Sequence, residues 1–114
     1  MINTAIDMER AVIILKLLGD KTRLTMIKLL ESNECCVCEF VGIFEMSQPA
    51  ISQHLRKLKD VELVKEERRG QWIFFHLNEK SERYPFVLSI LRQLPDQTYK
   101  LKEIEAAGKR LICE

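Results

Sequence analysis

The stretch at residues 47–58, SQPAISQHLRKL, constrains the fold of this chain more than any other. Its apolar side chains recur with the period of an α-helix, which predicts a helix with one buried face. These apolar residues are Ile51, Leu55 and Leu58. Ser47 has the side chain of an N-cap, and Pro49 falls in the first turn, where its missing N–H costs little. The pattern therefore predicts an amphipathic helix that begins just after Ser47.

The other face of this helix carries amide, hydroxyl, imidazole and basic side chains, groups that can pair with base edges and phosphates in the major groove of DNA. The candidate DNA-binding residues of the helix are Ser47, Gln48, Ser52, Gln53, His54, Arg56 and Lys59. The charge of the chain changes sign here, because residues 29–55 contain no Lys or Arg and residues 56–69 contain six. A solvated surface helix would have a similar polar face, so the flanking segments must decide between the two interpretations.

Length and charge exclude several classes of protein. A chain of 114 residues predicts one domain, residues 1–114. The net charge of +1 argues against a non-specific polycation but allows a local basic surface. The apolar runs are too short to span a bilayer, and the first residues lack the basic and apolar regions of a secretory signal. We therefore expect a cytoplasmic protein that does not contact a membrane.

Two helices are predicted before residue 34. Residues 8–18 are so rich in apolar side chains that a helix there would be buried on most sides, and a second subunit is a natural cover. Gly19 ends this helix, and Asp20 is placed to cap a second one. Residues 31–33, Glu-Ser-Asn, predict a break after the second helix.

A third, short helix is predicted at residues 34–45, joined to the helix at 47–58 by a tight turn. This arrangement is a helix-turn-helix candidate. The following segment, residues 63–77, predicts a β-hairpin with a charged tip, because aromatic and β-branched residues follow Gly70. Directly after a helix-turn-helix such a hairpin is a wing, although an ordinary hairpin would look similar. Its candidate DNA contacts are Arg68, Arg69 and Gln71.

Two more helices are predicted after the hairpin. Pro85 opens a helix that runs to about Leu94, where Pro95 stops it. A last amphipathic helix is predicted at residues 97–112. The fold class that follows is mainly α with a β-hairpin wing, a winged helix-turn-helix.

Three motifs, in this order, resemble the ArsR/SmtB family of metalloregulatory repressors. LKLLGDKTRLTMIKLL, residues 15–30, looks like that family's first-to-second helix segment. The sequence Cys-Val-Cys at 36–38, followed by Glu39, is similar to its metal-box motif. SQPAISQHLRKL, then Leu-Val and an Arg-Arg-Gly wing, completes the match. The resemblance covers residues 8–94 and leaves residues 95–114 as an additional C-terminal helix.

The resemblance implies a homodimeric repressor that holds double-stranded operator DNA and releases it when a metal or metalloid binds. It also implies that the first helix and the helix after the wing form the dimer interface. The family's positions at the DNA groove match Ser47, Gln48, Ser52, Gln53 and His54, and Arg56 matches a phosphate contact. The family's alternative site of Asp and His on the helix after the wing is not expected here, because residues 85–114 contain no His.

The candidate metal ligands are Cys35, Cys36, Cys38 and Cys113. Clustered cysteines in a small cytoplasmic protein suggest metal or redox chemistry rather than a disulfide framework. Thiolates are soft ligands that suit As(III), Sb(III), Cd(II), Pb(II) and Zn(II). Zn(II) and Cd(II) usually take four ligands, and the cluster offers three sulfurs and no nearby His. The three-coordinate metalloids As(III) and Sb(III) are therefore favoured.

The third ligand is left open by the sequence. Arsenic-responsive members of the family often carry a Cys three residues after the Cys-Val-Cys pair, where this chain has Val41. On an intact helix Cys35 and Cys38 would share a face. In an extended segment Cys36 and Cys38 would point the same way, and Cys113 could complete the site, within one chain or across a dimer. Each cysteine could also be a small buried hydrophobic residue.

Other functions remain as alternatives. A repressor that responds to Cd(II), Pb(II) or Zn(II) would need a fourth ligand, and a thiol redox switch would pair a clustered cysteine with Cys113 on oxidation. A winged helix that binds protein is less favoured, because the polar face suits base edges. An enzyme is least favoured, since the sequence has no Gly-rich phosphate loop and no recognisable catalytic triad.

The sequence predicts two opposing effects on the thiol pKa values. Glu34 and Glu39 would raise the pKa values of nearby thiols, and a helix N-terminus would lower them.

Overall fold

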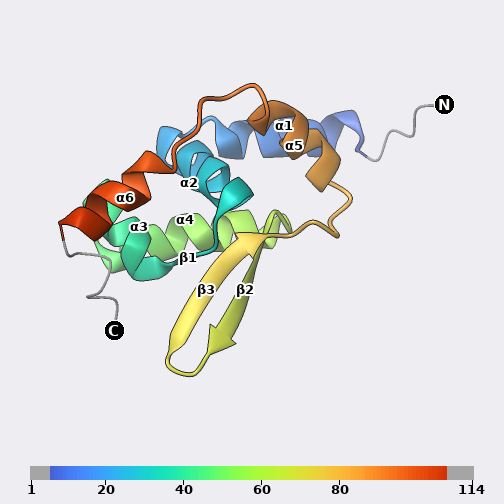
Figure 1. Cartoon of the computed structure of the whole chain (residues 1–114). Coiled ribbons are helices and arrows are strands. Elements are labelled where there is room, and N and C mark those ends of the chain that lie inside the picture. Colours follow the sequence, from blue (N-terminus) through green and yellow to red (C-terminus); the bar gives the residue numbers. More distant parts are fainter. Residues whose placement is uncertain (1–5, 108–114) are drawn as a thin grey trace.

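The computed structural model describes residues 6–107. Within them, helices surround one core, and a β-hairpin projects from the side of the molecule away from α1 and α5 (Figure 1). In chain order the elements are α1 (Met8–Leu18), α2 (Lys21–Ser32), β1 (Cys35–Cys36), α3 (Val37–Phe44), α4 (Gln48–Asp60), β2 (Val64–Arg69), β3 (Trp72–Leu77), α5 (Tyr84–Leu91) and α6 (Tyr99–Ala106). Among the described residues, no helix is long and apolar enough to cross a membrane.

Local side chains set where the helices begin. The carboxylate of Asp20 accepts the backbone N–H of Arg23 at 3.0 Å, which confirms the predicted cap of α2. The hydroxyl of Ser47 accepts the N–H of Ala50 at 3.3 Å at the start of α4, with Pro49 in its first turn. The predicted helix at residues 47–58 is therefore confirmed, including its start.

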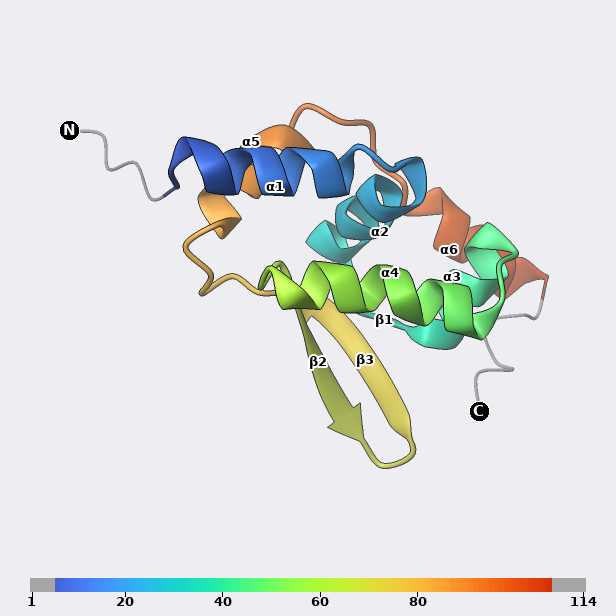
Figure 2. The ribbon, with the colours of Figure 1, turned by 180° about the vertical axis from the view of Figure 1, so that it is seen from behind.

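The core forms where the apolar faces of the helices meet the base of the sheet. Leu58 and Ile51 of α4 are fully buried, as are Leu29 of α2, Phe40 of α3 and Leu91 of α5. Burying a Leu or Ile side chain contributes about 1.5–3 kcal/mol. These contacts fix α4 by its inner face and leave its outer face exposed, beside the wing (Figure 2).

The hairpin belongs to a three-stranded antiparallel sheet with strand order β1-β3-β2. Arg69 pairs with Trp72, so the turn holds two residues, and Gly70 adopts φ +64° as a tight hairpin turn requires. The third strand is the short segment Cys35–Cys36, which pairs with Phe74 and Phe75 of β3. The predicted hairpin is confirmed, but the sequence did not predict its partner strand.

Several predicted boundaries are wrong. The helix expected at residues 34–45 begins only at Val37, because Cys35–Cys36 is extended and bonded to β3. The helix after the wing ends at Leu91, ahead of the expected Leu94. The last helix runs from Tyr99 to Ala106 rather than from residue 97, and residues 108–112 of its predicted range lie outside the described residues.

Helix α1 is buried on one side within the chain, where Ile14 and Leu18 enter the core. Its other sides expose large apolar side chains, by 41–79% of their surface. These residues are Met8, Val12, Ile13 and Leu15. The expectation that α1 would be buried on most sides is thus not met by one chain alone.

Candidate DNA-binding surface and cysteine pair

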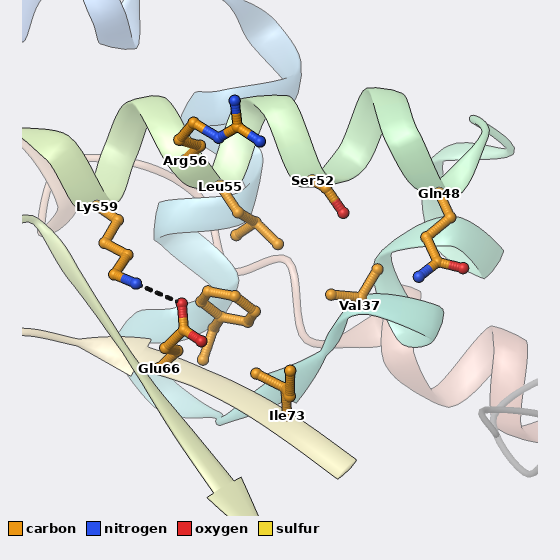
Figure 3. A pocket seen from close by; sticks show the side chains of 9 residues that line it. Val37, Gln48, Ser52, Leu55, Arg56, Lys59, Glu66 and Ile73 are labelled. Carbon is orange, nitrogen blue, oxygen red and sulfur yellow. Dashed lines mark hydrogen bonds and ion pairs between the residues drawn. The ribbon is translucent and has the colours of Figure 1, made fainter. Parts of the chain in front are cut away.

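The outer face of α4 and the wing enclose a shallow groove (Figure 3). Helix α4 contributes mostly polar side chains to it, strand β2 contributes Glu66, and strand β3 and the start of α3 contribute apolar side chains. The lining residues are Val37, Gln48, Ser52, Leu55, Arg56, Lys59, Glu66, Ile73 and Phe75. The helix and the wing therefore present one continuous surface, with the helix rim carrying the donors and acceptors suited to nucleic acid.

Helix α4 and the wing are joined by an ion pair. The Nζ of Lys59 lies 2.6 Å from Oε1 of Glu66 on β2, and both side chains are partly exposed. A pair of this exposure contributes at most about 1 kcal/mol. Its structural effect is to hold the Lys59 ammonium at the wing side of the helix (Figure 3).

The predicted contacts on α4 differ in where they lie. Ser47, Gln48 and Gln53 are exposed, and Ser52 is half-buried in the groove. His54 is on another side, because residues two apart on a helix point about 200° apart. Its Nδ1 accepts a hydrogen bond from Nη1 of Arg23 on α2 at 3.0 Å.

The imidazole of His54 is held in its neutral form by this environment. Burial lowers the pKa of His54 below its ordinary value, and the nearby Arg23 charge acts in the same direction, whereas Asp20 opposes it. A neutral ring can accept the Arg23 hydrogen bond, and a protonated one cannot. His54 therefore ties α4, the predicted reading helix of the helix-turn-helix, to α2.

The predicted wing contacts also differ from one another. Arg68 and Gln71 are exposed at the tip of the hairpin. Arg69 is instead engaged within the chain: its guanidinium donates to Glu34, just before β1, and to Glu67 on its own strand. Sequence reasoning missed Glu34 as a partner of the wing, since nothing local links residues 35 positions apart.

The cysteine cluster is divided by the change from strand to helix. Cys35 is fully buried in the core, and Cys36 is 5% exposed and caps α3 from extended backbone. Cys38 is in the first turn of α3 and half-buried. The Sγ atoms of Cys36 and Cys38 lie 2.9 Å apart, so the structure brings these two together. Cys113 lies outside the described residues.

The backbone of the cysteine pair is fixed by Glu39, which is 4% exposed. Its Oε1 accepts the N–H of Cys36 at 2.8 Å. Burial, with the Glu39 charge as a further cause, raises the pKa of the Cys36 thiol to about 11. The Glu39 effect expected from the sequence therefore acts at Cys36, but burial, which that expectation did not include, is the larger cause of the raised pKa.

The described residues supply two adjacent sulfurs rather than a complete metal site. Within residues 6–107, no three His, Cys, Asp or Glu side chains are grouped so that they could hold a metal ion. In the structure Cys36 is a thiol and Cys38 is disulfide-bonded. Once Cys38 is reduced, the pair fits part of a thiolate site, because two soft donors then lie together one short helix before α4. The same region contacts the wing through the pairing of β1 with the middle of β3.

Known proteins are similar to this chain in both sequence and fold. Residues 20–66 match the model of the bacterial regulatory protein, arsR family. The arsenical resistance operon repressor of Staphylococcus aureus is 32% identical over 101 residues, 89% of this chain and 86% of that protein. The arsenic resistance transcriptional regulator ArsR1 of Pseudomonas putida is 40% identical over 67 residues; this covers 58% of the chain and only 52% of that relative's length.

The fold is similar to that of solved regulators. Reduced HlyU from Vibrio cholerae superposes with a TM-score of 0.64 and is 32% identical, over 75% of this chain and 88% of that one. The winged helix-turn-helix predicted from the sequence is thereby confirmed. The match of residues 20–66 to the family model and the relative aligned over most of both chains together identify the family. The chain belongs to the ArsR family and is a DNA-binding transcriptional regulator rather than an enzyme.

Proposed function

We propose that this protein is a homodimeric repressor that releases operator DNA when As(III) or Sb(III) binds its cysteine thiolates. The observation that carries the proposal is the 2.9 Å approach of Cys36 Sγ to Cys38 Sγ at the start of the helix-turn-helix. The names of similar proteins support the choice of inducer, since the relative in Staphylococcus aureus is an arsenical resistance operon repressor.

The proposed chemistry is ligand exchange without oxidation or reduction. In the reduced protein each thiol replaces one hydroxyl of arsenous acid, forming one As–S bond and releasing one water. Three thiols therefore release three waters and leave arsenic in a three-sulfur pyramid. Cys36 and Cys38 supply the first two sulfurs in this proposal.

The third sulfur is proposed to come from Cys113 rather than Cys35. Cys35 is fully buried in the core, and successive residues of a strand point to opposite faces, so its thiol points away from that of Cys36. Helix α6 packs on α3, where Ile104 atoms lie 3.6–3.8 Å from the position of a Cβ on Gly42. The six residues from 107 to Cys113 can span at most about 20 Å, so this proposal needs the Cys36–Cys38 pair to lie within that distance of residue 107.

The proposed DNA contacts follow from the surface of α4 and the wing tip. They are Ser47, Gln48, Ser52, Gln53, Arg56, Lys59, Arg68 and Gln71. In this proposal His54 and Arg69 support DNA binding indirectly, by holding α4 and the wing through their partners Arg23 and Glu34. The amides and hydroxyls would read base edges, and the basic groups would contact phosphates. In a dimer, two such surfaces must match the spacing of two half-sites.

The exposed apolar face of α1 supports the proposed dimer. Four large apolar side chains expose 41–79% of their surface there. Contiguous apolar surface on a small protein marks an interaction site more often than a solvated face. The occupant proposed is a second copy of this chain, so that a change at the cysteines alters the relative position of two reading helices.

A fluorescence-anisotropy titration tests the function. The reduced protein is titrated against labelled DNA from its own upstream region, alone, with arsenite, with Cd(II), with Zn(II), and after mild oxidation. Loss of binding with arsenite supports the proposal. Loss only with Cd(II) or Zn(II) would assign a four-ligand site, and loss only on oxidation would assign a redox switch.

A further inference from the structure

The guanidinium of Arg69 crosses the wing sheet and is held at the opposite edge by Glu34. Arg69 is on β2, yet its Nη1 donates to Oε2 of Glu34 at 2.6 Å and its Nη2 to Oε1 at 2.8 Å. On the way it lies over the ring of Phe74 of the central strand, 4.8 Å from the ring centre. A two-pronged contact of this kind fixes the direction of both side chains as well as their distance.

Glu34 stands immediately before the cysteine segment. The next two residues form β1, in which Cys36 pairs with Phe74 through the backbone. Phe74 therefore contacts both residues: its backbone pairs with Cys36, and its ring lies under the guanidinium of Arg69. Because β1 and β2 both pair with β3, a shift of β1 would move the Glu34 carboxylate relative to the strand that carries Arg69.

A second carboxylate, that of Glu67, allows the connection of Glu34 to β1 to be tested separately from its charge contact with Arg69. Nη2 of Arg69 also donates to Oε1 of Glu67 at 2.9 Å, but Glu67 lies on the same strand as Arg69. The hydrogen bonds from Arg69 lower the pKa values of both Glu34 and Glu67, so both are ionised at neutral pH. Glu67 thus shares the charge contact and lacks the connection to β1.

We propose that Glu34 is a positioning residue that couples the cysteine pair to the wing, so that a metalloid on Cys36 and Cys38 displaces β1, loosens the hold on Arg69 and moves the wing away from its DNA-binding position. This inference rests on the proposed function and adds a structural path from the cysteine pair to the wing. The wing, in addition to the reading helix, becomes an element that the cysteine site controls.

Trp72 reports on the wing directly. It is the only tryptophan of the chain and pairs with Arg69 across the hairpin. The experiment compares the unmodified protein, Glu34→Gln and its matched control Glu67→Gln. Each reduced protein is titrated with arsenite while two signals are followed: ultraviolet absorption of the arsenic–thiolate bonds, and Trp72 fluorescence. The ratio of DNA affinities with and without arsenite is then measured for each.

The unmodified protein and Glu67→Gln are expected to show both signals. Glu34→Gln should keep the arsenic–thiolate absorption, lose most of the Trp72 response, and show a ratio of DNA affinities that is smaller by about two- to fivefold, the range open to a partly exposed ion pair. Circular dichroism checks that each variant is folded, and both substitutions are at exposed positions.

Two results would overturn the coupling. If Glu34→Gln responds like the unmodified protein, the ion pair transmits nothing. If both variants lose the response equally, the charge on Arg69 matters and its connection to β1 does not. Failure of the proposed function looks different, because the unmodified protein itself would then show no arsenic–thiolate absorption or would keep its DNA; that result removes the coupling as well.

Discussion

Replacing Gly42 by alanine is predicted to stabilise the protein, although the residue lies at a helix-to-helix contact. Gly42 is inside α3, facing α6, and its φ is not positive. A Cβ added there would meet the side chain of Ile104 at 3.6, 3.7 and 3.8 Å, which is ordinary van der Waals contact. The added methyl therefore fills space without displacing Ile104.

The expected gain comes from helix propensity. Glycine in a helix interior is about 0.8–1 kcal/mol less favourable than alanine, and the new contact with Ile104 adds a little burial. Gly42→Ala should therefore raise the free energy of unfolding by about 1 kcal/mol and the midpoint temperature by roughly 4 °C. Urea unfolding at one fixed protein concentration, followed by circular dichroism, measures this.

Gly70→Ala is the matched control. Gly70 has φ +64° and nothing within 4 Å of an added Cβ, so alanine would meet no clash but would hold a left-handed conformation. That conformation costs about 1–2 kcal/mol for a residue with a Cβ, and the control should be destabilised. A Gly42→Ala variant less stable than the unmodified protein would refute the packing of α6 on α3 described above.

Three further predictions concern the dimer, the reading helix and its surface. Ile13→Glu places a charge on the exposed apolar face of α1, where Ile13 is 54% exposed, and should convert dimer to monomer in sedimentation velocity; an unchanged mass would exclude this face as the interface. Because the pKa of His54 is lowered, its neutral form stabilises the fold above its unfolded-state pKa of about 6.5, and this contribution is lost as the pH falls through the folded-state value. The urea midpoint of the His54→Asn variant should therefore decrease less between about pH 7 and 5 than that of the unmodified protein. An equal decrease in both proteins would show that other groups cause it. Arg56→Gln should weaken DNA binding on all sequences and lower the salt slope by about 1, whereas an unchanged slope would show that Arg56 meets no phosphate.

The helices could be predicted from the sequence because their signals are local. The N-caps Asp20 and Ser47 lie beside the helices they start, and the buried face of α4 repeats at helical spacing. The wing was predicted for the same reason, since Gly70 marks its turn within the segment itself.

The parts that could not be predicted depend on contacts between distant segments. Cys35 and Cys36 carry no local signal of a strand, and only their pairing with Phe74 and Phe75 makes them one. The Glu34 contact of Arg69 likewise joins residues far apart in the chain. The sequence therefore offered two pairings of the cysteines, and tertiary structure selected Cys36 with Cys38.

The most direct test of the central claim is arsenite-driven release of DNA by cysteine variants. Anisotropy of labelled upstream DNA is followed while arsenite is added to the reduced protein, to Cys36→Ser/Cys38→Ser and to Cys35→Ala as a control for the buried cysteine. The unmodified protein and the control should release DNA, and the double variant should bind DNA and keep it at every arsenite concentration. Release by the double variant would contradict the assignment of Cys36 and Cys38 as the metalloid ligands.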